Sequence, residues 1–193
     1  MDIPVISLRK RNQLATMKLV QEKSVTMMHE QGFDETTIEA IAESSGVSAS
    51  TIYRYFGTKE KIILWDEKTE ALDAALVSSL SKTGVFYAFR DSVVTHLAQR
   101  EDQELFLRRL RLIFAVPAIW SAAAHEDRIS RMELADGIAR SQRRKKTSLA
   151  DQLVASCCLA ALDIALEAWV DADGKVSLEV LIDQSMAELL KIS

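Results

Sequence analysis

The sequence is poor in residues on which several large protein classes depend. Its 193 residues include six glycines and two prolines, too few for the many turns of a β-sandwich or barrel. The two cysteines are neighbours, at 157 and 158, a spacing that does not form an ordinary disulfide and suits a reducing compartment. The apolar stretch 153–166 contains Asp163 and is shorter than the roughly 20 residues of a membrane span. No signal peptide is visible, so we expect a soluble, cytoplasmic protein.

Signatures of catalysis and of metal binding are missing as well. The three histidines, His29, His96 and His125, lie far apart, and none has a second ligand at metal-binding spacing. There is no Gly-x-Ser-x-Gly elbow and no phosphate-binding glycine-rich loop. The run Asp171 to Gly174 matches part of a calcium loop but lacks the acids at its first and last positions, which favours a helix-ending turn. We therefore expect no enzyme, no metal and no cofactor.

The sequence is rich in helical patterning. Apolar residues make up 48% of the chain and aromatic residues 6%, a composition typical of an all-α bundle. Glycines are expected to end helices at Gly32, Gly46, Gly57 and Gly174. The predicted helices are 13–31, two short helices within 36–57, a long helix from 58 through Leu72 to Leu80, then 85–100, 103–115, 117–143 with an interruption near Gly137, 148–172 and 177–192.

Residues 36–59 carry the most specific pattern in the chain. Thr36 is predicted to cap a short helix, with Glu39 completing a capping box. Gly46 stands where the chain must turn, and Ser48 is predicted to cap a second short helix. Two short helices joined by a tight turn have the shape that fits the major groove of DNA.

The second of these helices has an unusual outward face. Ile52 and Phe56, four residues apart, are expected to point inward. The outward positions carry small, hydroxylated, aromatic and guanidinium side chains, which are types that approach base edges and phosphates closely. These positions are Ala49, Ser50, Thr51, Tyr53, Arg54 and Tyr55.

The net charge of −4 argues against DNA binding only at first sight, because the distribution matters more than the sum. Residues 1–65 hold eight basic and eight acidic side chains, so the remainder of the chain carries the whole −4. Arg9-Lys10-Arg11 forms a basic N-terminal arm. This arm either reaches phosphates or a minor groove, or is a disordered solubilising tail, and the sequence leaves both interpretations open.

A family resemblance rests on residues spread over four predicted helices. About 45 residues resemble the DNA-binding domain of TetR-type bacterial regulators. The resemblance implies an all-α homodimer with an N-terminal arm and helix-turn-helix domain, 1–58, and a helical-bundle domain for ligand binding and dimerisation, 59–193. It implies a repressor that a small effector releases from a near-palindromic operator. The matching residues are Gly32-Phe33, Thr36-Thr37, Ile41-Ala42, Gly46-Val47-Ser48, Thr51-Ile52-Tyr53, Tyr55-Phe56 and Thr58-Lys59-Glu60.

The resemblance also assigns roles on DNA. It implies phosphate contacts by Thr37, Tyr53, Tyr55 and Lys59. The candidates for base contact or close groove approach are Ser48, Ala49, Ser50 and Arg54, and Thr51 is expected at the DNA interface without an assigned role. Arg54 is predicted to read guanine, because its fork matches two acceptors on that base. Ala49 stands where the family often has a basic residue or proline. For Tyr53 and Tyr55, the alternative role is packing between the two short helices.

The resemblance further implies that the last two helices pair with their copies in a four-helix interface, with core burial as the alternative. The expected interface residues are Leu153, Leu159, Leu162, Leu166, Trp169, Leu181 and Leu189. The expected ligand-binding residues, for which ordinary core packing is the alternative, are Trp65, Phe86, Phe89, His96, Phe106, Arg109, Phe114, Trp120 and Met132.

Segments 110–117 and 160–174 resemble the acyl-CoA-responsive branch of the family, which implies a long apolar effector such as a fatty acyl-CoA. The basic run 140–146 either meets the phosphates of such a ligand or is a solvated helix end. A helical lipid or acyl-CoA carrier or interaction protein without operator binding remains the alternative function.

Overall fold

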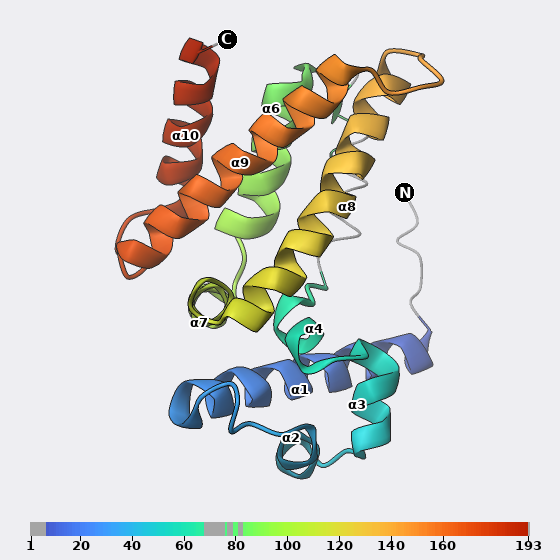
Figure 1. Ribbon diagram of the computed structural model, residues 1–193, viewed down its shortest axis with the longest axis vertical. Coiled ribbons are helices and arrows are strands. Elements are labelled where there is room, and N and C mark those ends of the chain that lie inside the picture. Colours follow the sequence, from blue (N-terminus) through green and yellow to red (C-terminus); the bar gives the residue numbers. More distant parts are fainter. Residues whose placement is uncertain (1–6, 68–75, 77–78, 81–82, 193) are drawn as a thin grey trace. The chain divides into compact units, whose positions relative to one another are not determined.

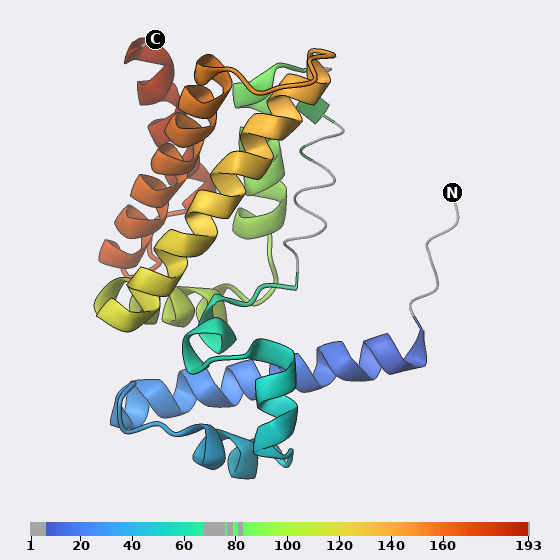
Figure 2. The same ribbon diagram turned by 45° about the vertical axis from the view of Figure 1, so that its right-hand side comes forward.

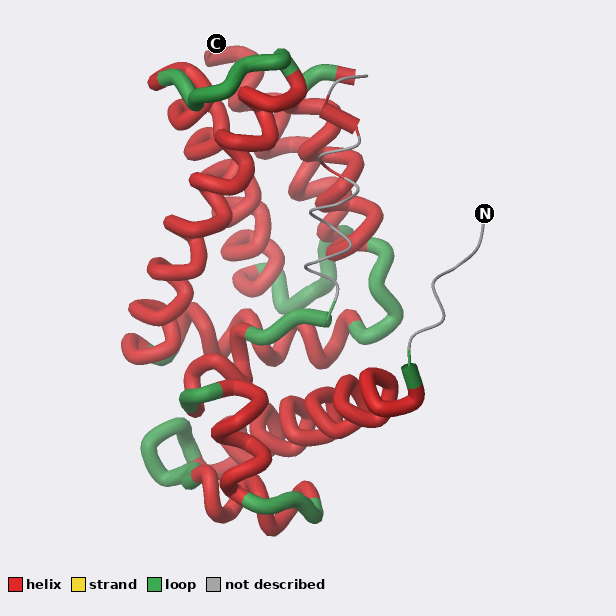
Figure 3. The backbone as a smooth tube through the Cα atoms, turned by 90° about the vertical axis from the view of Figure 1, so that its right-hand side faces the viewer, coloured by secondary structure: helices red, strands yellow, loops and turns green. Residues whose placement is uncertain are grey.

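The computed structural model describes residues 7–67, 76, 79–80 and 83–192. Every regular element within these residues is a helix (Figure 3), which confirms the all-α expectation. The chain divides into two compact units. The first unit comprises Met1–Glu67 and Leu112–Ala122, and the second comprises Lys68–Arg111 and Ala123–Ser193.

The first unit contains α1 (Leu8–Gln31), α2 (Ile38–Ser45), α3 (Ala49–Phe56) and α4 (Lys59–Leu64), shown in blue to cyan in Figure 1. Apolar side chains from all four helices meet in one core. Its most buried members, each at most 1% exposed, are Val20, Val25, Ile41, Ile52, Ile62 and Ile63. Burial of such side chains, each contributing about 1.5–3 kcal/mol, holds the two short helices against α1.

Local signals set the ends of α2 and α3. Thr37, not Thr36, is the N-cap of α2 and accepts a hydrogen bond from the amide of Ala40 at 3.1 Å. The predicted cap was therefore wrong by one residue, and the predicted capping box with Glu39 does not form. Thr36 is buried instead, and its hydroxyl donates to the Gly32 carbonyl at 2.7 Å. Gly46 ends α2 with φ 67° and ψ 28°, a left-handed conformation that glycine adopts without strain. Ser48 caps α3 as predicted.

Two other predicted boundaries in this unit were wrong. Helix α1 begins at Leu8 rather than near residue 13, so Arg9-Lys10-Arg11 forms its first turn and is not a separate arm. The long fourth helix is not continuous, because α4 ends at Leu64 and residues 65–67 are not helical. Of the predicted positions beyond this break, Leu72 lies outside the described residues, whereas Leu76 and Leu80 are helical. The buried side chain of Gln21 donates to the carbonyls of Ile62 and Trp65, both at 2.7 Å, and fixes this end against α1.

The second unit is built from α6 (Val85–Val93), the π-helix η1 (Val94–Ala98), α7 (Gln103–Ala115), α8 (Pro117–Ser141), α9 (Leu149–Asp171) and α10 (Leu178–Ile192). Residues 112–122, at the end of α7 and the start of α8, belong to the first unit. The expected helix 85–100 therefore changes to π geometry at Val94. Helix α8 runs unbroken through Gly137, where an interruption was predicted. Its buried neighbours Leu134, Ala135 and Ile138 offset the cost of glycine, about 1 kcal/mol.

Helices α9 and α10 form an antiparallel pair, seen side by side in Figures 1 and 2. Ser148 and Asp151 make a capping box at the start of α9. The guanidinium of Arg144 donates to both oxygens of the Asp151 carboxylate, at 2.5 and 2.6 Å. These hydrogen bonds hold the pKa of Asp151 well below its usual value. Arg144, one cation of the basic run 140–146, therefore serves the helix cap.

Candidate nucleic-acid interface

Helix α3 presents the two faces that its sequence predicts. Ile52 and Phe56 are buried, at 1% and 6% exposure. Ser50, Tyr53 and Arg54 are exposed, and Ala49, Thr51 and Tyr55 are half-buried. The inward pair anchors the helix in the first unit, so the outward side chains are held on a rigid element, as close reading of DNA requires.

Three hydroxyl groups gather at the start of α3. The Ser48 hydroxyl lies 2.9 Å from the hydroxyls of both Ser50 and Thr51. Hydroxyl groups donate and accept hydrogen bonds, so the cluster can meet either a phosphate or a base edge. These residues open the helix, and the N-terminal residues of a recognition helix are those that contact base edges.

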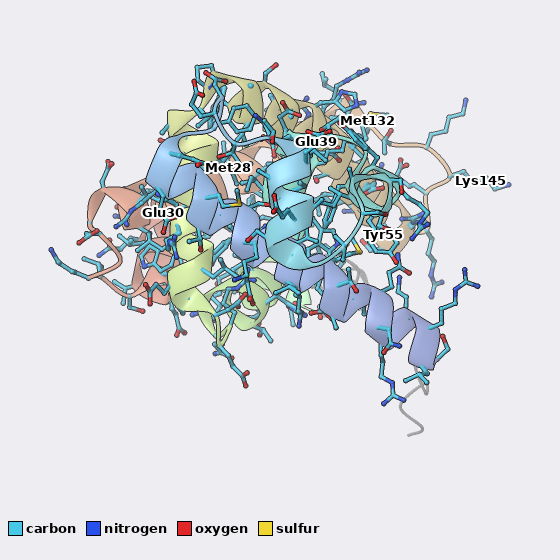
Figure 4. All side chains as sticks on the ribbon, turned by 90° about the horizontal axis from the view of Figure 1, so that it is seen from below. Met28, Glu30, Glu39, Tyr55, Met132 and Lys145 are labelled. Carbon is cyan, nitrogen blue, oxygen red and sulfur yellow. The ribbon has the colours of Figure 1, made fainter. Side chains whose placement is uncertain are left out.

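The aromatic side chains of α3 have different environments. Tyr53 is 51% exposed and is not packed between α2 and α3. Tyr55 is half-buried, lies beneath the Arg54 guanidinium at 5.0 Å from its ring centre, and faces the N-terminal half of α1 (Figure 4). Arg54 is thus partly ordered by its neighbour. Its phosphate or guanine contact stays a prediction.

The ammonium group of Lys59 is already engaged within the first unit. It donates to the carbonyls of Phe33 at 2.6 Å and of Thr36 at 2.9 Å, and lies 4.0 Å from the centre of the Phe33 ring. An ammonium has three N–H groups, so one is left for a phosphate. Thr37 is exposed at the start of α2. The phosphate contacts assigned to both residues remain predictions, and the structural role of Lys59 could not be found from sequence spacing.

We expect Lys59→Met to lower the free energy of unfolding by about 1–3 kcal/mol, because it removes two charge-assisted hydrogen bonds to the turn between α1 and α2. Methionine keeps most of the aliphatic stem, so the decrease reports the ammonium. Urea denaturation followed by circular dichroism measures it. Lys23→Met, an exposed change on α1, is the matched control, and equal midpoints for both variants would contradict the prediction.

The structure does not gather the predicted ligand residues into one site. In the first unit, Trp65 packs edge-on against Phe56 and Phe114 packs against Trp120, with ring centres 6.0 and 5.7 Å apart. Trp120 is 46% exposed.

In the second unit, the predicted ligand residues fall in several places. Phe106 packs against Trp169 at 5.8 Å, with the guanidiniums of Arg100 and Arg109 at 4.3 and 5.9 Å from its ring. Sequence reasoning missed Arg100, which is only 6% exposed. Phe89 is buried, and the Nδ1 atom of His96 lies 2.8 Å from the carbonyl of Ser92.

Phe86 and Met132 line two surface grooves of the second unit. One lies between α6 and α10, and the other, of about 530 Å³, lies between α8 and α9. Of the predicted set, the structure therefore brings together two separate pairs, Phe106 with Arg109 in the second unit and Phe114 with Trp120 in the first.

The predicted interface residues also divide. Leu166 and Trp169 are buried in the second unit, at 9% and 4% exposure, so they are core residues rather than interface residues. Leu159, Leu162, Leu181 and Leu189 are half-buried. Leu153 is 62% exposed, and two residues that the sequence reasoning missed, Leu149 and Ile164, are 83% and 62% exposed.

The spacing of these exposed residues places them on one side of α9. Leu149, Leu153, Ala160 and Ile164 follow one another at helical intervals, and all four are exposed. We call them the α9 face. Next to it, the pKa of Asp163 is raised to about 6 by burial and by the charges of Asp127 and Glu167.

Helix α9 has the length that the sequence predicts, but its apolar stretch extends beyond the predicted 153–166. Among the described residues it is the one helix long and apolar enough to cross a membrane, with a mean hydropathy of 1.9 over 18 residues, 28% of which are buried. The same properties suit a helix that pairs with another protein surface. Its tight packing against α10 and its Asp163 and Glu167 side chains favour the second interpretation.

Comparisons with known proteins agree with this architecture. The profile described as bacterial regulatory proteins of the tetR family matches residues 22–64, and that of the MftR C-terminal domain matches residues 83–192. The HTH-type transcriptional regulator TcmR of Streptomyces glaucescens is 26% identical over 123 residues, covering 58% of this chain. The match spans about half of that relative, 54% of its length.

Solved structures share the fold at low sequence identity. NalD, the secondary repressor of the MexAB-OprM multidrug efflux pump in Pseudomonas aeruginosa, superposes with a TM-score of 0.62 at 15% identity, covering 93% of this chain and 96% of NalD. A TetR-family regulator from Mesorhizobium loti gives a TM-score of 0.56 at 18% identity, covering 93% and 97%. FadR of Thermus thermophilus, in complex with lauroyl-CoA, gives 0.53 at 18% identity, covering 90% and 93%.

A helix-turn-helix in the first unit and a helical second unit, each matched by a family profile, define a DNA-binding transcriptional regulator rather than an enzyme. The chain belongs to the TetR family of bacterial regulatory proteins.

Proposed function

We propose that this regulator is a cytoplasmic homodimeric repressor that leaves a near-palindromic operator when it binds a small hydrophobic effector. The observation that carries the proposal is the exposed outer face of α3, on a helix that its capped start and buried Ile52 hold in place. We place the functional boundary at the start of α4, with DNA binding in 1–58 and ligand binding and dimerisation in 59–193.

The α9 face supports the homodimer. It leaves large apolar side chains in solvent over about 15 residues, or about 22 Å of helix. Exposed apolar patches of this kind mark interaction sites, and a two-fold axis lets one patch cover its own copy. A second copy of the chain is the occupant that the family favours, since TetR-family regulators dimerise.

On DNA, we propose that α3 enters the major groove of each half-site. In this proposal the hydroxyl cluster at its start and the exposed Arg54 approach bases. The phosphates are contacted by Tyr53, Tyr55, Thr37 and the remaining N–H of Lys59. The two-fold symmetry of the dimer would set the half-sites one helical turn of DNA apart, about 34 Å.

For the effector, we propose a fatty acyl-CoA or a similar amphiphile with a long apolar chain. Support comes from the lauroyl-CoA held by the similarly folded FadR. An effector shifts the repressor off DNA only by its difference in affinity for the two forms, typically about 1–3 kcal/mol.

A mobility-shift titration with the DNA upstream of the protein's own gene tests the proposal. The purified chain should shift this DNA, but not a shuffled sequence, in a salt-sensitive manner, and added lauroyl-CoA should release it. A chain that binds lauroyl-CoA but never distinguishes the two DNAs would instead be a lipid carrier. Mass spectrometry of co-purifying small molecules identifies the natural effector directly.

A further inference from the structure

The N-terminal turns of α1 extend beyond the recognition helix α3. Figure 2 shows α1 running on past α3 toward the N-terminus. Residues 8–12 are all exposed, so this end of the helix is not held by a core. It nevertheless forms, with Tyr55 of α3, an open groove of about 550 Å³ lined by Leu8, Arg9, Asn12, Gln13, Thr16 and Tyr55.

The charge of this segment is unusual for a helix start. Residues 7–21 contain no acidic side chain but four cations. One of them, Lys18, pairs with Glu67 at 2.5 Å. The other three, Arg9, Lys10 and Arg11, which we call the basic turn, form no ion pair with any residue that the structure describes.

The basic turn is also unfavourable for the helix that carries it. The N-terminus of a helix bears a partial positive charge, which favours acids and disfavours cations in the first turn. Helix α1 has no acid there. A sequence that breaks a local rule without an internal compensation points to a function for the residues involved.

The side chains of α1 that line the groove lie on one side of the helix. Arg9, Asn12, Gln13 and Thr16 recur at helical spacing and so share one side of α1, which faces Tyr55. Tyr55 carries the Arg54 guanidinium 5.0 Å above its ring. The lining of the groove thus includes one cation, Arg9, together with hydrogen-bonding side chains and no acid, and a second cation, Arg54, lies over its Tyr55 ring.

We propose that this groove binds the sugar-phosphate backbone of the DNA strand that flanks the bases facing α3. Arg9 and the rest of the basic turn supply charge, and the Asn12 amide and the Tyr55 hydroxyl donate hydrogen bonds to phosphate oxygens. The groove shares Tyr55 with the recognition helix, so a duplex seated on α3 continues into it. This inference rests on the proposed function and extends its footprint on DNA beyond the helix-turn-helix.

The test is the salt dependence of DNA affinity, measured on the full chain with a duplex selected from a random pool by the wild-type protein. In the variant Arg9→Gln/Lys10→Gln/Arg11→Gln, the slope of log K against log salt should fall by about 0.9 for each phosphate that the basic turn no longer neutralises, and by about twice that in a dimer. The ratio of affinities for the selected and a shuffled duplex should not change. Thermal stability should hold or rise, because the variant removes cations from a helix N-terminus.

A matched control removes the same charge elsewhere. Arg140→Gln/Lys145→Gln/Lys146→Gln takes three exposed cations from the second unit and should leave the slope at its wild-type value. A basic-turn variant whose slope equals that of this control overturns the inference while leaving the proposed function standing. A wild-type chain that binds no duplex in a sequence-dependent manner overturns the proposed function, and this inference with it.

Discussion

The substitution Ile164→Glu is expected to leave the protein monomeric and to abolish its binding to a two-half-site operator. Ile164 is 62% exposed in the single chain, on an apolar helix, with no cover among the described residues. In a two-fold interface the same side chain is buried twice, once from each copy. Glutamate would place two carboxylates there with no cation on α9 within a turn of either.

The expected size of the effect follows from burial. Removing one apolar side chain of this size costs about 1.5–3 kcal/mol, and the change occurs in both copies, so the dimer dissociation constant should rise about 10²–10⁴-fold. Analytical ultracentrifugation measures the dissociation constant, and a mobility shift measures operator binding.

Two controls accompany this substitution. Ile164→Val keeps an apolar side chain and should stay dimeric. The circular dichroism spectrum of Ile164→Glu should match that of wild type, because the residue lies outside the core of the single chain. A variant that sediments as a dimer of wild-type strength would show that the interface lies elsewhere.

The second large effect is expected at Arg54. Arg54→Ala should weaken operator binding by about 1–3 kcal/mol and relax base preference at one position of each half-site, because it removes a bidentate hydrogen bond from arginine to guanine. Binding of a randomised set of operators, with each position varied in turn, measures the preference.

Arg54→Lys separates two roles for this side chain. Lysine keeps the charge but not the planar fork, so base preference should disappear while the salt slope stays. Lys59→Met provides the contrast, because the phosphate contact proposed for its ammonium carries no base preference, and its loss should weaken binding to all sequences alike. If neither Arg54 variant changes affinity or base preference, α3 is not the recognition helix.

Much of the first unit could be predicted because its signals are local. The cap at Ser48, the turn at Gly46 and the inward pair Ile52 and Phe56 depend on residues a few positions apart. Even the error in the N-cap of α2 was a shift of one residue, from Thr36 to the neighbouring Thr37. The ends of α7, α9 and α10 likewise lie at or next to the predicted positions.

The features that were missed depend on contacts between distant residues. Helix α4 ends where the side chain of Gln21 donates to the carbonyls of Ile62 and Trp65, 41 and 44 positions later in the chain. The ammonium of Lys59 donates to the carbonyls of Phe33 and Thr36, 26 and 23 positions earlier. An apolar helix does not reveal which side its own chain covers, so Leu166 and Trp169 were predicted at an interface and Ile164 was overlooked. The structure shows that Leu166 and Trp169 are buried in the second unit and that Ile164 is exposed.

The α9 face has a genetic consequence under the proposed dimer. Subunits made from two alleles in one cell would mix, because the face that joins them is the same on both. A chain altered only in α3 would still dimerise with normal chains. Each mixed dimer would have a single intact recognition helix, so the allele would be dominant. An allele that damages the α9 face would pair with normal chains only weakly, because even one altered copy costs about 1.5–3 kcal/mol of the interface, and would be recessive.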